Sequence, residues 1–454
     1  MDSINPVDGT TIAHYDAHAP EQVDEVLDRS VNGAAKWAAT PLADRAAALE
    51  RLADLLERDA ERLGHLITTE MGKPIAQARA EANKCAWAAR HYAAHAREML
   101  APQQIEMDDG EAYVQYLPLG VVLGTMPWNY PLWQAFRAAV PIMAAGNGFL
   151  LKHAGNVSGC ALAMRELVAE AGFPGGAFEV VLISGSEASS LLSDPRIAAA
   201  TLTGSERAGS AMAASAGEEL KKTVLELGGS DPYVVLADAD VTAAAQTAVT
   251  ARFQNTGQSC IAAKRFLVVE DVADEFIQTF VDGATALTQG DPTDENVYLG
   301  PLARPDLRDN VADQVQRTVE AGGTVLTGGE TPQGPGAFYP ATVVVVPDTT
   351  APMMQEEVFG PAAAVLRVPD EATAIAMANE TSFGLSASLW TNDLDRARRL
   401  SGQVHAGGCF VNSMVASDPR LPFGGIKRSG YGRELAWFGI TEFTNAQTVR
   451  VTTP

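Results

Sequence analysis

One cysteine lies in a loop whose composition suits a nucleophile. Cys260 follows the polar run NTGQS (255–259), whereas the other three cysteines fall in segments expected to form helices or an apolar strand: Cys85, Cys160 and Cys409. A lone cysteine is more often a small buried residue, but reactive thiols occur in polar loops. We therefore expect Cys260 to carry chemistry and the other three cysteines to be structural.

Two further side chains could assist such a thiol. Glu226 precedes Cys260 by 34 residues, in a short apolar stretch that ends at a glycine pair (228–229). Burial would raise the pKa of its carboxyl group and suit it to act as a general base, although a surface glutamate at a strand end fits equally well. Asn129 lies between the two prolines of PWNYP (127–131). It could cap a tight turn or donate a hydrogen bond to an oxyanion.

A glycine-containing turn offers a weaker signal for nucleotide binding. TGSERAG (203–209) joins an expected strand to an expected helix, and such a turn can seat a phosphate at the helix N-terminus. It does not match the G-x-G-x-x-G pattern, and many α/β turns look similar. Lys152 ends another expected strand, where a lysine is more often solvated than bound to a ribose.

Short apolar runs alternate with helical stretches from residue 111 onward, after about a hundred residues that are mainly helical, including 21–38 and 75–99. Repeated β-α-β units with short loops predict parallel, doubly wound sheets. Two such α/β halves meet near residues 226–232, where a cleft between domains would form. The last segment, 447–452, resembles a strand, which needs a partner sheet in this chain or in another subunit.

Bulk properties exclude several function classes. The net charge of −23 over 454 residues disfavours nucleic acid and anionic lipid as partners. Four scattered cysteines without a C-x-x-C pair disfavour structural zinc and fit a reducing compartment. The start MDSINPVDGT lacks the pattern of a secretory signal, and no apolar run is long enough to span a membrane. We expect a cytoplasmic protein without a bound metal.

Seven segments together resemble the aldehyde dehydrogenase family over essentially the whole chain. No single segment is specific, but the order in which all seven occur is specific. The segments are PWNYP (127–131), LKHA (151–154), TGS (203–205), ELGG (226–229), GQSC (257–260), EEVFGP (356–361) and PFGGIKRSGYGRE (422–434). The resemblance implies an α/β fold with two doubly wound parallel-sheet domains plus a small oligomerisation sheet. The implied dinucleotide-binding domain is 1–110 with 127–226, the catalytic domain is 227–425, and the oligomerisation segments are 111–126 and 438–454.

The resemblance also implies roles for individual residues. Cys260 is the nucleophile that forms a thiohemiacetal and then a thioester, Glu226 the general base, and Asn129 the oxyanion donor. The remaining matches are to cofactor contacts of the family: Trp128, Lys152, Gly204, Ser205, Leu227, Glu357 and Phe359. A homodimer or homotetramer is implied by the same resemblance.

Within the family the chain is similar to short bacterial succinate-semialdehyde dehydrogenases, through NYPLWQAFR (129–137), KHAGNV (152–157) and NTGQSCIAAKRF (255–266). Arg137 matches an arginine that meets the distal carboxylate of the substrate there, a role that suits a guanidinium fork. The alternative for Arg137 is an ion pair on a helix surface. Ser259 and Ser417 could complete the carboxylate pocket, and a short aliphatic aldehyde is the alternative substrate.

Cofactor choice depends on Gly155, where many NAD-preferring relatives carry a glutamate. Without that carboxylate a 2′-phosphate is admissible, and His153 or Lys152 could help to bind it. We therefore favour NADP and keep NAD open. Two rival functions remain: a Cys–Glu thioesterase or hydrolase without redox chemistry, and a catalytically silent relative.

Overall fold

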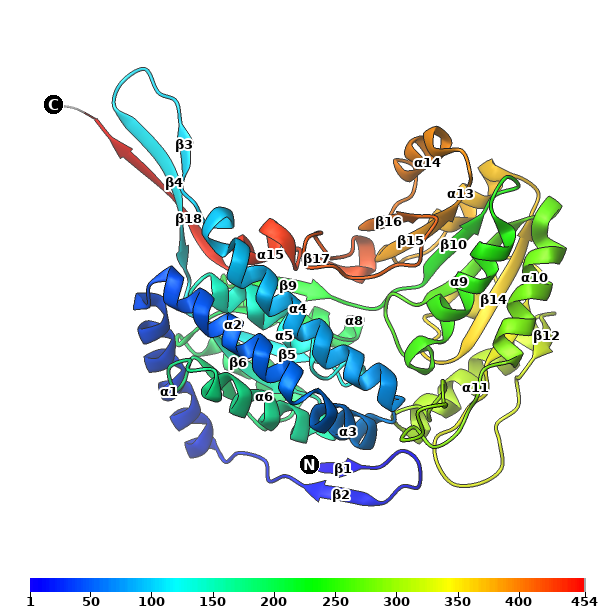
Figure 1. Cartoon of the computed structure of the whole chain (residues 1–454), viewed down its shortest axis with the longest axis horizontal. Helices are drawn as coiled ribbons and strands as arrows, with labels where there is room; N and C mark the ends of the chain where they lie inside the picture. Colours follow the sequence, from blue (N-terminus) through cyan, green and yellow to red (C-terminus); the bar gives the residue numbers. More distant parts are fainter. Residues whose placement is uncertain (453–454) are drawn as a thin grey trace.

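Two parallel sheets, one in each of two lobes, form the framework of the protein (Figure 1). The computed structural model describes residues 1–452. The central strands are buried on both faces and are mostly apolar, as is typical of parallel strands covered by helices, although β11 also carries Lys264 and Arg265. This confirms the predicted doubly wound α/β class. Among the described helices, none has the length and apolar character needed to cross a bilayer.

The first lobe contains a six-stranded sheet in the order β17-β9-β8-β5-β6-β7, parallel except between β17 and β9. Its strands are β5 (Val121–Met126), β6 (Gly148–His153), β7 (Phe178–Val180), β8 (Ile197–Thr203), β9 (Lys222–Glu226) and β17 (Gly430–Tyr431). Its helices are α1 (Pro20–Ala39), α2 (Leu42–Arg58), α3 (Ala60–Met71), α4 (Ile75–Met99), α5 (Trp133–Ala144), α6 (Ser158–Glu170), α7 (Gly185–Ser190) and α8 (Glu206–Glu218).

The second lobe contains a seven-stranded sheet in the order β12-β13-β14-β11-β10-β15-β16, parallel except between β12 and β13. Its strands are β10 (Asp231–Val235), β11 (Ala263–Val269), β12 (Thr324–Thr327), β13 (Thr342–Val345), β14 (Ala362–Val368), β15 (Ser386–Trp390) and β16 (Gly408–Val411). Its helices are α9 (Val241–Phe253), α10 (Glu270–Thr285), α11 (Pro305–Glu320), α12 (Pro352–Gln355), α13 (Glu371–Asn379) and α14 (Leu394–Ser401).

A three-stranded antiparallel sheet projects from the first lobe as an arm (Figure 1). The arm consists of β3 (Gln103–Ile105), β4 (Glu111–Pro118) and β18 (Thr444–Val451), and α15 (Ala436–Glu442) leads into it. Its strands are largely exposed, in contrast to those of the two lobes.

The expected arm segment 111–126 needs a correction, because the structure divides it. Only β4 belongs to the arm, whereas β5 pairs in parallel with β6 and β8 inside the first lobe. The apolar run of β5 is buried, and burial in the core takes precedence over its sequence proximity to β4.

An N-terminal hairpin of β1 (Asp2–Ile4) and β2 (Thr11–His14) was not predicted. Short 3-10 turns complete the elements: η1 (Gly155–Val157), η2 (Leu191–Ser193), η3 (Gln254–Gly257) and η4 (Lys427–Ser429).

The fully buried Asn147 joins the arm to the first lobe. Its Oδ1 accepts hydrogen bonds from the backbone N–H groups of Leu119 (2.8 Å) and Gly120 (3.1 Å). Its Nδ2 donates to the carbonyls of Ile142 (3.2 Å) and Phe443 (3.0 Å). One side chain therefore connects the turn between β4 and β5, the end of α5 and the start of β18.

We expect Asn147→Ala to lower the free energy of unfolding by about 3 kcal/mol, because it leaves buried donors and acceptors without partners. Urea unfolding followed by circular dichroism measures the change. The matched control is Asn32→Ala, since Asn32 is exposed on α1 and makes a single bond to the Asp28 carbonyl. Equal stability of the two variants would contradict the assigned role of Asn147.

Candidate active site

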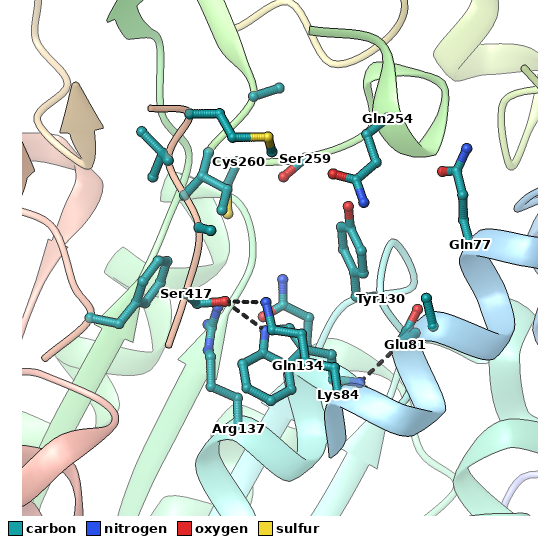
Figure 2. A pocket seen from close by; sticks show the side chains of 18 of the residues that line it. Gln77, Glu81, Lys84, Tyr130, Gln134, Arg137, Gln254, Ser259, Cys260 and Ser417 are labelled. Carbon is teal, nitrogen blue, oxygen red and sulfur yellow. Dashed lines mark hydrogen bonds between the residues drawn. The ribbon is translucent and has the colours of Figure 1, made fainter. Parts of the chain in front are cut away.

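Cys260 lies between two cavities. Cavity A, of about 150 Å³, is bounded by α4, α5 and the loop after β16, and its lining includes Lys84, Trp133, Arg137 and Ser417 (Figure 2). Cavity B, of about 200 Å³, also has Cys260 in its lining and is bounded in part by the PWNYP loop and the turn after β8. Because Cys260 lines both cavities, a molecule in either one can contact its sulfur.

The loop that carries Cys260 has an unusual backbone. Asn255 and Thr256 both have φ of 54°, and Gly257 has φ of 70°. A Cβ at Gly257 would lie 2.3 Å from the carbonyl oxygen of Gly360, so only glycine fits there. This run of left-handed residues turns the chain sharply between α9 and β11 and places Cys260 at the cleft.

Hydrogen bonds join this loop to the PWNYP loop of the other lobe. Asn255 Nδ2 donates to the carbonyl oxygens of Asn129 (2.8 Å) and Gln258 (3.1 Å), and Asn129 Nδ2 also donates to the Gln258 carbonyl (3.1 Å). Lys264 Nζ donates to the carbonyls of Ser259 (2.9 Å) and Cys260 (2.8 Å). Hydrogen bonds from Asn129 in the first lobe and from Lys264 in the second lobe therefore hold the backbone around Cys260.

Burial raises the pKa of the Cys260 thiol to about 11, although the positive charges of Arg137 and Lys264 act in the opposite direction. In the free protein at neutral pH the thiol is therefore mostly protonated. Cys85 and Cys160 are fully buried, with pKa values that burial raises well above the ordinary range. Cys260 is thus distinguished by its position at two cavities rather than by a lowered pKa.

Glu226 ends β9 beneath the cleft, next to the lining residue Leu227. Its side chain is buried, both carboxylate oxygens lack a hydrogen-bond partner among the described residues, and it lines neither cavity. Burial, followed by the negative charge of Glu434, raises its pKa well above the ordinary value, while Arg137 opposes the rise. The direction of this shift matches what the sequence led us to expect.

Six of the predicted cofactor contacts line cavity B: Trp128, Gly204, Ser205, Leu227, Glu357 and Phe359. Ser205 caps the N-terminus of α8, and its side chain accepts a hydrogen bond from the Ala208 N–H. Trp128 and Phe359 stack edge to face, with their ring centres 5.7 Å apart. Glu357 Oε1 accepts from the Gly229 N–H (3.0 Å) and lies 3.7 Å from Lys264 Nζ.

The other two predicted cofactor contacts lie outside cavity B. Lys152 is near the end of β6, and burial lowers its pKa. Gly155 begins η1, and a Cβ there would lie 3.3 Å from the sulfur of Met1. His153 is buried between the carbonyls of Met126 and Pro131, and burial lowers its pKa to about 4. His153 is therefore neutral and enclosed, which corrects the suggestion that it could bind a phosphate.

The three predicted substrate residues all line cavity A: Arg137, Ser259 and Ser417. Arg137 is buried rather than on a helix surface, and its Nε pairs with the Glu434 carboxylate. Its Nη2 donates to Thr203 Oγ1 (3.2 Å), and its guanidinium lies 4.5 Å from the centre of the Phe423 ring. The Nε and Nη2 atoms of the Arg137 guanidinium are therefore already engaged by protein groups.

Several functional neighbours escaped the sequence reasoning. Glu81 on α4 accepts bonds from the backbone N–H groups of Leu132 (2.8 Å) and Trp133 (2.9 Å), and its other oxygen pairs with Lys73. It thereby fixes the start of α5 against α4. Lys84 lies one turn further along the same helix and lines cavity A. The spacing of Gln77, Glu81 and Lys84 would have placed these polar side chains on one face of the expected helix.

Known proteins are similar to this chain in sequence. The model of the aldehyde dehydrogenase family matches residues 1–449. The chain belongs to this family. The NADP(+) succinate-semialdehyde dehydrogenase 1 of Mycobacterium tuberculosis is 48% identical over 450 residues and 98% of each chain. The NADP(+) succinate-semialdehyde dehydrogenase of Mycobacterium avium is 48% identical over 451 residues, with 98% of this chain and 96% of that one covered.

Solved structures agree with the fold. The succinic semialdehyde dehydrogenase of Streptococcus pyogenes, solved in complex with NADP+, superposes with a TM-score of 0.97 at 34% identity, with both chains fully covered. The structure of Gox0499 superposes with a TM-score of 0.98 at 39% identity over 99% of each chain. The predicted family and its two-domain α/β architecture are confirmed.

We expect alkylation of Cys260 by iodoacetamide to accelerate about tenfold per pH unit between neutral pH and about pH 10, because only the thiolate reacts and the pKa of this thiol is raised. Peptide mass spectrometry assigns the label, and Cys260→Ser is the control that loses it. A rate that levels off below about pH 9 would contradict the raised pKa.

Proposed function

We propose that this aldehyde dehydrogenase oxidises succinate semialdehyde to succinate with NADP as the hydride acceptor. The observation that carries the proposal is the lining of cavity A, which places the cations Lys84 and Arg137 and the hydroxyl of Ser417 in the same small cavity as the Cys260 thiol. A short aldehyde with a carboxylate at its far end matches this combination. The names of the mycobacterial relatives support the same substrate.

Cavity B has the features that a nicotinamide dinucleotide requires. It combines an aromatic wall of Trp128 and Phe359 with the N-terminus of α8 behind Gly204 and Ser205. A Cβ at Gly228 would lie 2.3 Å from Glu357 Oε2, so glycine leaves room for this carboxylate at the cavity wall. We infer that Glu357 would hold the nicotinamide ribose in cavity B, where the cofactor, when bound, would supply the hydride acceptor.

The chemistry of the remaining residues follows from their positions. The Cys260 thiolate adds to the aldehyde carbon, forming a C–S bond and an oxyanion. One N–H of Asn129 Nδ2 is bonded to Gln258, and the other is available to stabilise this oxyanion together with the backbone N–H of Cys260. Loss of hydride from the same carbon leaves a thioester on Cys260.

Hydrolysis of the thioester needs a base, and we assign that step to Glu226. Its two carboxylate oxygens have no hydrogen-bond partner that would hold them in place, and rotation of the side chain would bring them toward Cys260. The carboxylate removes a proton from water, the hydroxyl adds to the thioester carbon, and the C–S bond breaks to release the acid. Because the pKa of Glu226 is raised, the base form, and with it the hydrolysis rate, increases as the pH rises.

The choice of NADP rests on the surroundings of β6. Gly155 contributes no carboxylate that would repel a 2′-phosphate, and Lys152 supplies a positive charge near the end of the same strand.

We also propose that the first lobe binds the dinucleotide, that the second lobe carries the nucleophile, and that the exposed arm pairs with another subunit in a homodimer or homotetramer. A hydrolase without redox chemistry would have no use for cavity B.

We expect kcat/KM for succinate semialdehyde to exceed that for propanal by roughly 100-fold, since hydrogen bonds to a charged group contribute most of the difference. Reduced-nicotinamide absorbance measures both rates, with NADP and NAD in parallel, and we expect NADP to be the better acceptor. Protection against heat by each cofactor provides an independent measure of binding. Equal rates with the two aldehydes would refute the substrate assignment while leaving the dehydrogenase intact.

A further inference from the structure

Lys84 places an ammonium group in cavity A without a carboxylate to balance it. Figure 2 shows the hydrogen bond between Lys84 and Ser417, in which Nζ donates to Oγ (2.9 Å). The same Nζ lies 4.5 Å from the centre of the Trp133 ring. No carboxylate of residues 1–452 lies within ion-pair distance of this nitrogen. The side chain points from α4 toward the loop that carries Ser417, and it takes part in lining the cavity that reaches Cys260.

Neighbouring buried cations are balanced in a way that Lys84 is not. Arg137 pairs with Glu434, and Lys73 pairs with Glu81. Lys84 is only partly buried, but even partial burial of an ammonium group without a counter-charge is unfavourable, and it lowers the pKa of Lys84 to about 8. A cost of this kind, paid inside the cavity of the proposed substrate, indicates an anionic ligand.

Ser417 strengthens this interpretation. Its Oγ accepts hydrogen bonds from both Lys84 Nζ (2.9 Å) and Trp133 Nε1 (3.2 Å). A hydroxyl that accepts twice still has its own proton to donate. Lys84 and Ser417 therefore form a cluster of donors at the end of cavity A bounded by α4. A carboxylate, which only accepts hydrogen bonds, complements such a cluster.

We propose that Lys84, together with the hydroxyl of Ser417, binds the distal carboxylate of the substrate and thereby restricts the enzyme to short aldehydes that carry a terminal carboxylate. This assignment rests on the proposed aldehyde dehydrogenase function and deepens it. Arg137, whose Nε and Nη2 are engaged by Glu434 and Thr203, contributes its positive charge and its remaining Nη1 beside this Lys84 contact.

The proposal predicts a pH dependence that is specific to the substrate. The charged groups around Lys84 are Glu81 and Cys85 on its own helix, Arg137 on α5, and Asp418 beside Ser417. Asp418 is already paired with Arg420. The ammonium form of Lys84 is present below a pH of about 8 and is lost above it, so the preference for a carboxylate falls as the pH rises. Ionisation of Cys260 affects both substrates equally and cancels in their ratio.

The test measures the ratio of kcat/KM for succinate semialdehyde to kcat/KM for propanal with saturating NADP. We expect Lys84→Met to lower this ratio by one to two powers of ten at neutral pH, because a charge-assisted contact to the carboxylate is lost. Lys84→Arg should restore most of the ratio and remove its fall above a pH of about 8, since a guanidinium stays charged. The matched control is Lys36→Met, at an exposed lysine on α1.

Two outcomes would overturn the proposal, and they are distinguishable. If the wild type prefers succinate semialdehyde and Lys84→Met keeps the ratio within twofold, the role of Lys84 is wrong while the proposed function stands. If the wild type shows no preference over propanal, the substrate assignment and the role of Lys84 fail together. Should Lys84→Met fold poorly, Lys84→Arg and the pH profile of the wild-type ratio decide the question by the same criteria.

Discussion

The requirement that one sulfur atom face two cavities organises this protein. Cys260 must meet an aldehyde on one side and a hydride acceptor on the other, so its loop has to be held where the two lobes meet. The side-chain amides of Asn255 and Asn129 provide this restraint, because both donate to the Gln258 carbonyl and Asn255 also donates to the Asn129 carbonyl. The left-handed backbone at 255–257 is tolerated because these contacts hold it.

Burial of charge is the second organising feature. Burial is the main cause of the raised pKa of Glu226, and the nearby Arg137–Glu434 pair modifies it, because Glu434 raises this pKa and Arg137 lowers it. Removing the Arg137 guanidinium would leave Glu434 and Glu226 as buried like charges, so a loss of activity in Arg137→Ala would not isolate a substrate contact. Lys84 is a cleaner probe, because removing its ammonium group leaves no partner carboxylate without a counter-charge.

Much of the fold and the reactive residues could be predicted from the sequence, because both depend on local pattern. The short apolar runs that alternate with helical stretches after residue 111 indicated parallel sheets, and the polar loop before Cys260 indicated a presented thiol. The sequence did not reveal that the expected oligomerisation segment 111–126 is divided between the arm and the first lobe, because domain membership depends on which strands pair, and pairing partners are distant in the sequence. The N-terminal hairpin was missed because its strands are only three and four residues long.

Residues that act through tertiary contacts were harder to predict. Lys84 lies on α4, and the sequence of this helix does not show that the Lys84 side chain faces a cavity. Glu434 comes close to the site only because the C-terminal region returns to the first lobe. The positions of Lys152 and Gly155 outside cavity B likewise follow from the three-dimensional path of β6 rather than from motif spacing.

The most direct test of the central claim is mass spectrometry of Glu226→Gln after mixing with succinate semialdehyde and NADP. Without its base the enzyme should form reduced cofactor once and then stop at the thioester. The account predicts that the peptide containing Cys260, and no other cysteine peptide, gains the mass of one succinyl group. Formation of reduced cofactor with unmodified Cys260, or an adduct at another cysteine, would contradict it.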